Sequence, residues 1–345
     1  MSEAKILFIG PGAIGASVAA WVAESYPAVF IMGHGQTQAA LRNDGITTYA
    51  LTEPERTRRT VRVAIVDRLG EIADADIVVL AVKNYSLEAV AQQVRDELGD
   101  RPIILSLANG IDNQRILPKL FTKVIYGVVA YNARRDGPTV VGYQHKGPLL
   151  IGTPDNSLGA ELQLVQSILS RGCPTQIVDR LQDAVHTKIV INLTNALDAL
   201  VGRGWRPLSN LAVYQQLLSQ TLWEGVRTIR AAGFHEYRIP GMPPFSLLRL
   251  TALIPGWIIR PVFKRRLSAM AMSSMTQDVA LRGAHDTELE SITGYVVRLA
   301  AEHGVAAPYN RAIYRLGREK FRPGFEPLRC EDVLAAVERE KAAAS

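Results

Sequence analysis

The chain has 345 residues, 48% of them hydrophobic, which is enough for about two domains with a substantial core. Its net charge of +6 and pI near 9.3 suit anionic small molecules, and no basic patch interleaved with aromatic residues indicates a nucleic-acid partner. Cys173 and Cys330 lie far apart and form no metal-binding spacing, so we expect a reduced, cytoplasmic protein without a metal site.

The stretch from Lys5 to Ala20 has the order strand, glycine-rich turn, helix. An apolar run precedes the turn Gly10-Pro11-Gly12-Ala13-Ile14-Gly15, and small residues then begin a helix. In this pattern Gly10 permits a sharp turn, Gly12 lets a pyrophosphate approach the backbone, and Gly15 lets helix and strand pack closely. The helix N-terminus offers N–H groups and a positive dipole end to phosphates. We therefore expect these six residues to bind a dinucleotide, and an ordinary strand–helix turn is the alternative.

The end of the second predicted strand, Ala28–Met32, bears on the choice of cofactor. An Asp or Glu at this place hydrogen-bonds the adenosine ribose of NAD and repels a 2′-phosphate. The residues that follow, Gly33-His34-Gly35-Gln36-Thr37, include no acid, which favours NADP. Arg42, in the next helix, is a more distant candidate partner for the phosphate.

Alternating strands and helices continue to Asp179 and predict an α/β fold with a parallel sheet. Lys83 directly follows a predicted strand that ends at Val82, and Asn109 lies shortly after the next predicted strand, which ends at Ser106. Ligands of open α/β sheets bind beyond the carboxyl ends of the strands, so we expect both residues near cofactor or substrate. A solvated lysine and a simple Asn-Gly turn are the alternatives. The polar run 53–60 is expected to be a surface loop.

From Leu181 onward the pattern changes to helical periodicity, which predicts two domains, residues 1–179 and 180–345. Residues 180–200 predict one helix, which places Lys188, Asn192 and Asn195 on one face. Polar groups in so apolar a stretch need buried partners or a ligand, although a wet surface with a snorkelling lysine is the alternative. The apolar and basic stretch 245–267 contains too many arginines and prolines for a membrane span, and we expect neither a signal peptide nor a transmembrane segment.

Several motifs, in order along the chain, resemble the ketopantoate reductase (2-dehydropantoate 2-reductase) family. They are GPGAIG at 10–15, AVK at 81–83, NG at 109–110, ARRDG at 133–137, KIVIN at 188–192, SSMTQD at 273–278, TE at 287–288 and HGVAAP at 303–308. The glycine loop alone fits many dehydrogenases, whereas the lysine–asparagine helix combined with the later motifs is much more specific.

The resemblance implies a Rossmann domain followed by an all-helical domain like that of 6-phosphogluconate dehydrogenase. It also implies NADPH-dependent reduction of ketopantoate to pantoate, in pantothenate and coenzyme A biosynthesis. Lys188 would be the general acid and Glu288 would lie at the catalytic and cofactor centre. Lys83, Asn109 and Ala133 would bind the cofactor. The substrate would be bound by Asn109, Lys188, Asn192, Asn195 and Ser274.

The chain departs from the family pattern near the substrate. The segment Asn195-Ala196-Leu197-Asp198 lacks the proline of the family's N-P-L-T, and His186 replaces a frequent tryptophan. A reductase of another 2-oxo or 3-oxo acid, of opine- or 3-hydroxyacid-dehydrogenase type, is therefore an alternative, and a catalytic His186 paired with an acid would favour it. A non-catalytic NADP-binding regulatory protein is the non-enzyme alternative. The oligomeric state stays open, with a homodimer as one option.

Overall fold

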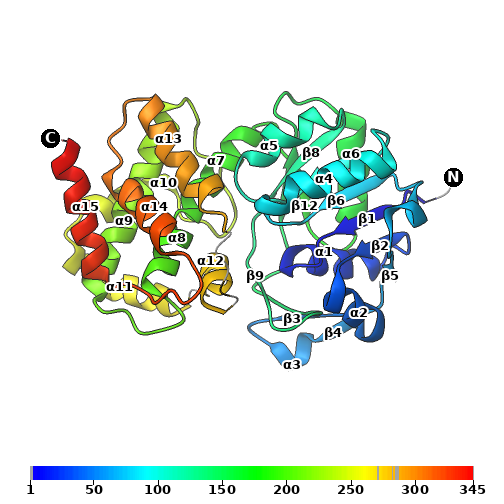
Figure 1. The fold of residues 1–345 in the computed structure, drawn as a ribbon, viewed down its shortest axis with the longest axis horizontal. Coiled ribbons are helices and arrows are strands. Elements are labelled where there is room, and N and C mark those ends of the chain that lie inside the picture. Colours follow the sequence, from blue (N-terminus) through cyan, green and yellow to red (C-terminus); the bar gives the residue numbers. More distant parts are fainter. Residues whose placement is uncertain (1–2, 270–271, 282, 284–286, 345) are drawn as a thin grey trace. The chain divides into compact units, whose positions relative to one another are not determined.

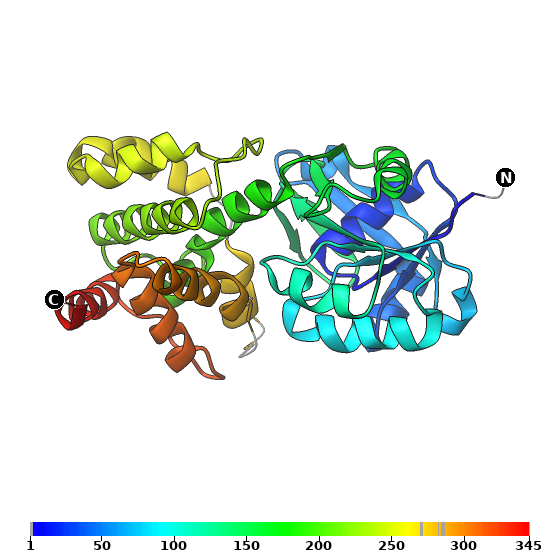
Figure 2. The ribbon, with the colours of Figure 1, turned by 90° about the horizontal axis from the view of Figure 1, so that it is seen from above.

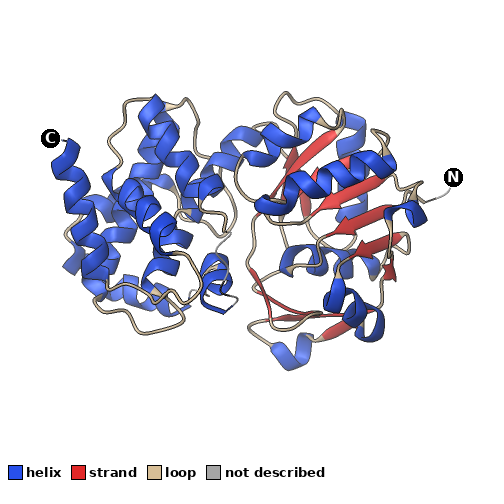
Figure 3. Cartoon of the chain, viewed as in Figure 1, coloured by secondary structure: helices blue, strands red, loops and turns tan. Residues whose placement is uncertain are grey.

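The computed structural model describes residues 3–269, 272–281, 283 and 287–344, and the chain forms two compact units, Met1–Gln182 and Asp183–Ser345 (Figure 1). Strands and helices alternate in the first unit, whereas the described elements of the second unit are helices (Figure 3). This arrangement confirms the predicted fold class. The expected domain boundary after Asp179 lies just before helix α7 begins at Leu181.

The first unit is built on an eight-stranded sheet in the order β12-β11-β8-β7-β6-β1-β2-β5. Neighbouring strands are parallel except β8 and β11. Its central strands are buried along their whole length and apolar except for Ser106 at the end of β7, as expected for a parallel sheet covered on both faces. The strands are β1 (Ile6–Ile9), β2 (Val29–Met32), β5 (Ala64–Ile65), β6 (Ile77–Leu80), β7 (Ile103–Ser106), β8 (Val124–Val129), β11 (Leu149–Gly152) and β12 (Thr175–Ile177).

Helices cover both faces of this sheet (Figure 2). In the order of the sheet, β2 lies on one side of β1, whereas β7 lies on the opposite side of β6. The β1–β2 and β6–β7 connections therefore run in opposite directions along the sheet. Because such crossovers are right-handed, the connecting helices lie on opposite faces. Helices α1 (Ala13–Ala23) and α6 (Gly159–Leu169) contact each other, and α4 (Asn84–Leu98) contacts α5 (Asp112–Ile116). Helix α2 (Gly35–Asp44) follows β2.

A second, four-stranded sheet lies against α1 and was not foreseen from the sequence. Its order is β4-β3-β10-β9, and all four strands contact α1. Helix α1 therefore packs against two sheets, which explains why its residues from Gly15 to Val22 are all buried. The expected loop 53–60 instead contains a short helix and the start of a strand. The elements are β3 (Ile46–Ala50), α3 (Pro54–Thr57), β4 (Arg59–Val61), β9 (Ala133–Arg135) and β10 (Val140–Tyr143).

The second unit packs around the long helix α9, which contacts most of the other helices. A buried carboxylate links α9 to α14. The Glu224 carboxylate of α9 accepts hydrogen bonds from the backbone N–H groups of Tyr309 and Asn310, at 3.0 and 2.9 Å, and so caps α14. The helices are α7 (Leu181–Asn192), α8 (Thr194–Val201), α9 (Leu211–Ala231), α10 (Phe245–Leu253), α11 (Gly256–Ala269), α12 (Ser274–Thr276), α13 (Tyr295–Glu302), α14 (Pro308–Lys320) and α15 (Cys330–Ala344), with π-helical turns at Gln277–Leu281 and Glu290–Gly294.

Candidate functional site

The glycine loop between β1 and α1 has the geometry that its sequence predicts. Gly10 has a φ of +97°, a conformation that side chains rarely tolerate, and an added Cβ would lie 2.8 Å from the Ala81 carbonyl oxygen. A Cβ on Gly15 would collide with the Gly10 carbonyl oxygen. These two glycines are therefore required for the turn to pack between β1 and β6.

Gly12 differs from the other two glycines because a Cβ there would meet no heavy atom within 4 Å. It is the N-cap of α1, and no side chain caps the first turn. The first helical hydrogen bond runs from Ala16 N to Gly12 O, at 2.9 Å, so Ala13, Ile14 and Gly15 precede it with their N–H groups at the helix N-terminus. Open space beside uncapped N–H groups fits an anion such as a pyrophosphate.

Lys83 and Asn109 both lie beyond the carboxyl ends of neighbouring strands. Lys83 is the N-cap residue of α4, after β6, and Asn109 lies in the turn after β7. The Asn84 side chain donates a hydrogen bond to the Asn109 carbonyl oxygen, and Gly110 has a φ of +83°. The structure therefore brings these two strand ends together. Ala133, the third expected cofactor residue, begins β9.

Side chains at the end of β2 form a hydrogen-bonded network that involves a distant carboxylate. The Gly33 N–H donates to the Gln38 side chain, at 2.6 Å, and the Gln38 amide donates to Asp67, at 2.8 Å. The Arg42 guanidinium contacts both oxygens of Asp67, at 2.8 and 2.7 Å, and lowers the pKa of that carboxyl. Arg42, the expected phosphate partner, is thus engaged by Asp67.

Arg135 is a second cation close to the end of β2, and the sequence did not single it out for this role. It lies on β9, and its guanidinium donates to the Thr37 hydroxyl, at 3.2 Å, and to the Gly137 carbonyl, at 2.9 Å. Thr37 lies in the first turn of α2, directly after β2. The position of Arg135 near Thr37 could not be derived from local sequence, because it depends on the pairing of β9 with β10 in the second sheet.

In the second unit, the charge of Glu288 acts on the ammonium of Lys188. Lys188 lies on α7 and is half-buried, and burial lowers the pKa of its ammonium to about 8, while the charge of Glu288 acts in the opposite direction. Glu288 is only 5% exposed and lies just before the π-helical turn at Glu290. The structure therefore brings together the two residues expected at the catalytic centre, and the lysine can gain or lose a proton near neutral pH.

The expected single helix over residues 180–200 is wrong, because the structure divides it at Leu193 into α7 and α8, although Leu193 keeps helical backbone angles. The Leu193 N–H is shared between the Ile189 and Val190 carbonyls, at 3.1 and 3.2 Å. Asn192 ends α7 and is 8% exposed, whereas Asn195 belongs to the first turn of α8 and is half-buried. Lys188 and Asn192 share a helical face, and Asn195 starts from a different helix.

Ser274 is the first residue of α12, a short helix that packs against α8. The preceding Ser273 caps this helix, since its hydroxyl accepts a hydrogen bond from Thr276 N at 3.2 Å. Ser274 is half-buried and α8 carries Asn195, so the two expected substrate residues belong to helices in contact.

His186 occupies a packed position within the helical unit. Its ring is 1% exposed and stacks on Phe234, with 3.4 Å between centroids, and Nε2 shares a hydrogen bond of 2.7 Å with the Tyr295 hydroxyl. These contacts are typical of a core histidine that fixes the orientation of α7.

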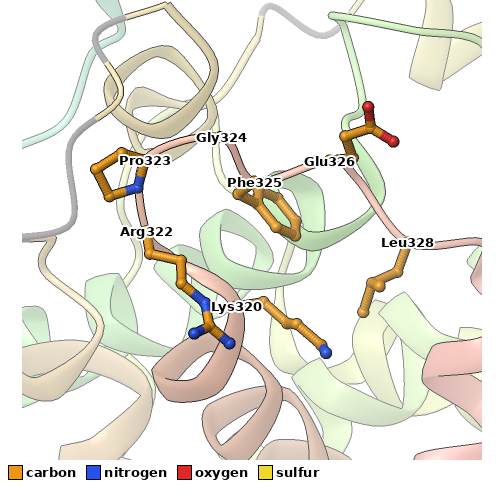
Figure 4. A pocket seen from close by; sticks show the side chains of 7 residues that line it. All are labelled: Lys320, Arg322, Pro323, Gly324, Phe325, Glu326 and Leu328. Carbon is orange, nitrogen blue, oxygen red and sulfur yellow. The ribbon is translucent and has the colours of Figure 1, made fainter.

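No group of three or more His, Cys, Asp or Glu residues is arranged to hold a metal ion in the part of the chain that the structure describes. A surface hollow of about 320 Å³ is lined by the end of α14 and the following loop, including Lys320, Arg322 and Phe325 (Figure 4). None of the expected site residues lines it. None of the described helices combines the length and apolar character needed to cross a bilayer.

Comparison with known proteins gives matches over most of the chain. The family model "Ketopantoate reductase PanE/ApbA" matches residues 6–156, and the model of the C-terminal part of the same family matches residues 180–321. The 2-dehydropantoate 2-reductase of Halobacterium salinarum is 28% identical over 93% of this chain and 100% of its own length. That of Archaeoglobus fulgidus is 26% identical over 92% of this chain and 98% of its own.

Solved structures share the fold along the whole chain. 2-Dehydropantoate 2-reductase from Geobacter metallireducens has a TM-score of 0.74 at 20% identity and covers 91% of this chain and 99% of its own. D-Mandelate dehydrogenase with NADH and anilino(oxo)acetate has a TM-score of 0.72 at 18% identity, and covers 98% and 99%. The two family models together span both units. The chain therefore belongs to the ketopantoate reductase family, dinucleotide-binding oxidoreductases that act on CH–OH groups.

Proposed function

We propose that the protein reduces a 2-oxo acid to a 2-hydroxy acid with NADPH, and that the substrate is ketopantoate. The observation that carries the proposal is Lys188, a half-buried lysine with a pKa of about 8 under the influence of the buried Glu288. The relatives named 2-dehydropantoate 2-reductase support the choice of substrate. We place the domain boundary between residues 179 and 180, with most of the proposed dinucleotide contacts before it and most of the proposed substrate contacts after it.

The dinucleotide would be held by the glycine loop, Gly10-Pro11-Gly12-Ala13-Ile14-Gly15, and by Lys83, Asn109, Ala133 and Glu288. The open space at Gly12 and the uncapped first turn of α1 fit its pyrophosphate. When bound, the reduced nicotinamide supplies the hydride for the 2-oxo carbon. Arg135 takes the place of Arg42 as our proposed partner for the 2′-phosphate, because its guanidinium lies at the Thr37 hydroxyl, directly after β2, where this phosphate is expected.

Hydride arrival at a carbonyl carbon leaves negative charge on its oxygen, and this chain's residues must stabilise and protonate that oxygen. We assign both tasks to the Lys188 ammonium. A pKa near 8 keeps the amine protonated at neutral pH while making it a much better proton donor than an exposed lysine. Asn109, Asn192, Asn195 and Ser274 would hold the substrate by hydrogen bonds.

A 2-oxo acid other than ketopantoate is the second candidate. The observation that favours it is Asp198, which stands in the segment that departs from the family pattern. Asp198 forms an ion pair with Arg203, at 2.6 Å, and accepts a hydrogen bond from the Tyr214 hydroxyl, at 2.6 Å. Because Tyr214 lies on α9, this buried carboxylate links the segment to α9. The packed environment of His186 gives no support to a catalytic histidine.

The test is NADPH oxidation against a panel of 2-oxo acids that includes ketopantoate and phenylglyoxylate. The proposal expects the highest kcat/KM with ketopantoate and at least about tenfold preference for NADPH over NADH, since one charge-assisted phosphate contact is worth roughly that factor. A higher kcat/KM with another acid would assign the second candidate. Absence of turnover with every acid, together with retained NADPH binding, would leave the non-catalytic reading.

For assembly and location we propose a cytoplasmic homodimer. A ketopantoate reductase from Staphylococcus aureus is described as dimeric, and it shares this fold with a TM-score of 0.64 at 21% identity. Light scattering coupled to size-exclusion chromatography measures the mass directly.

A further inference from the structure

Helices α10 and α11 carry a cluster of exposed apolar side chains that nothing in the proposed reaction uses. Its members are Leu250, Leu253, Trp257, Ile258 and Val262, which are 49, 64, 71, 50 and 63% exposed. They lie within one short stretch of the chain, whereas the other exposed large apolar residues that the structure describes are scattered over both units. A group of large exposed apolar side chains in one stretch of the chain is typical of an interaction site.

The two helices have distinct inner and outer faces. On the inner side Phe263 packs against Tyr214 of α9, with 6.1 Å between ring centroids, and Gln215 of α9 donates a hydrogen bond of 3.0 Å to the Gly256 carbonyl. On α11, Ile258 and Val262 are four residues apart and share one face, whereas Trp257 projects about 100° away from Ile258 around the helix. Both helices pack against α9, beside which they lie in Figure 2, and their apolar side chains named above are exposed.

The charged residues of α10 and α11 themselves are all basic. Arg249, Arg260, Lys264 and Arg265 are exposed on the same two helices. No aspartate or glutamate occurs in the sequence between Glu236 and Asp278, although acids are otherwise frequent in this chain. Apolar side chains that include an exposed tryptophan, bordered by cations, characterise helices that lie in the interface of a membrane.

We propose that the outer face of α10 and α11 docks the protein on a lipid surface that contains anionic headgroups. The apolar side chains enter the boundary between headgroups and acyl chains, with Trp257 at the headgroup level, and the cations contact lipid phosphates. The helices lie on the surface and do not cross it, which agrees with the absence of a sufficiently long apolar helix among the described residues.

A second copy of this chain is the competing occupant, and the charges disfavour it. A two-fold symmetric contact brings the same patch from both subunits together. Here that would place arginines and lysines of one copy against those of the other, with no acid in the stretch to compensate them. An anionic surface has the complementary charge.

The experiment is flotation of the full-length protein with vesicles of phosphatidylcholine alone or mixed with phosphatidylglycerol. The proposal expects binding to the mixed vesicles that weakens with salt, and much weaker binding to the neutral ones. No binding to mixed vesicles would overturn the proposal. Equal binding to both kinds of vesicle would also overturn it, because the cations would then have no part.

Two variants test the two components of the face. The double substitution Arg249→Gln and Lys264→Gln should lower the partition coefficient roughly 25-fold, at about fivefold for each cation removed. Its matched control is Arg56→Gln with Arg62→Gln, two exposed arginines of the first unit, which should leave binding unchanged.

Trp257→Ser with Val262→Ser should abolish flotation, whereas Leu164→Ser with Ile177→Ser, at exposed sites of the first unit, should not. Loss of binding in the control variants to the same extent would overturn the assignment.

Trp257→Phe distinguishes a lipid surface from a second copy. It keeps the face apolar, so vesicle binding should persist, but quenching of tryptophan fluorescence by brominated lipids should fall, because Trp257 is the tryptophan that these two helices expose. Unchanged quenching would overturn the proposal. If Trp257→Ser with Val262→Ser instead halves the mass measured by light scattering, the face belongs to a contact between copies. Turnover should be retained in all of these variants.

Discussion

The Glu288 carboxylate, 5% exposed, raises the pKa of the Lys188 ammonium while burial lowers it, with a net value of about 8. The two residues come from α7 and from the segment before the π-helical turn at Glu290, which the fold of the helical unit brings together. The balance between burial and the attraction of Glu288 sets the fraction of Lys188 that is protonated at neutral pH. It also allows the roles of the two residues to be tested separately.

Lys188→Ala should lower kcat by ~10²–10⁴-fold, the usual contribution of a positioned general acid. NADPH affinity should change little, since the glycine loop belongs to the other unit. Steady-state kinetics combined with fluorescence titration of NADPH measures both quantities. A variant within a few-fold of the parent kcat would remove this lysine from the mechanism.

Glu288→Gln should shift the alkaline limb of the pH profile. The proton donor is lost as pH rises through the pKa of Lys188, so kcat/KM for reduction should fall above about pH 8 in the parent. Without the negative charge of Glu288 the ammonium loses its attraction, its pKa drops, and the limb moves to lower pH. Glu290→Gln is the matched control, because that exposed carboxylate bonds Tyr314 instead. An unmoved limb in Glu288→Gln would contradict the pairing.

Lys188 should also make the parent's stability depend on pH. Between the folded pKa of about 8 and the ordinary value of 10.5 the unfolded chain binds the proton more tightly, so the free energy of unfolding rises with pH over that window. The full change is about 3 kcal/mol. Lys188→Met removes this titrating group. As pH rises through the window, the variant should therefore lose about 3 kcal/mol of stability relative to the parent, because only the parent gains stability. Urea unfolding at a series of pH values measures the difference, and parallel curves would contradict the lowered pKa.

Two alanine substitutions in the glycine loop should have different consequences, one for stability and the other for cofactor binding. Gly15→Ala places a methyl group against the Gly10 carbonyl oxygen and should lower the free energy of unfolding by about 1–3 kcal/mol. Gly12→Ala meets no protein atom within 4 Å and should fold normally, but its methyl group occupies the space proposed for the pyrophosphate and should weaken NADPH binding. Thermal unfolding and NADPH titration separate the two effects. Normal NADPH affinity in Gly12→Ala would place the pyrophosphate elsewhere.

Arg135→Ala should reduce the preference for NADPH over NADH by about tenfold or more, because it removes the proposed 2′-phosphate contact. The KM for NADH should be unaffected. Arg134→Ala is the control, since that neighbouring guanidinium bonds Tyr49 and Asp136 within the second sheet. Equal effects on both cofactors would assign Arg135 a structural role.

Local sequence was sufficient for the glycine loop, because each step of G-x-G-x-x-G has a steric reason that acts within a few residues. It was also sufficient for the strand ends at Lys83 and Asn109. It was insufficient for the second sheet, whose strands β3 and β10 pair across a long separation in sequence. Arg135 and Asp67 were missed for the same reason, since long-range pairing brings them to the end of β2. The break at Leu193 was missed because no proline or glycine marks it and the helical periodicity continues through it.

That break divides the lysine and the amide of Asn195 between two separately anchored helices. Helix α7 is fixed by His186 and Thr187, and α8 is fixed by Asp198 through Tyr214. A substitution that tilts or shifts α8 can therefore alter the surroundings of Asn195 without moving Lys188 or Asn192. If Asn195 and Lys188 have the roles proposed above, drift in α8 would let the chain exchange one 2-oxo acid for another while it inherits the same proton donor.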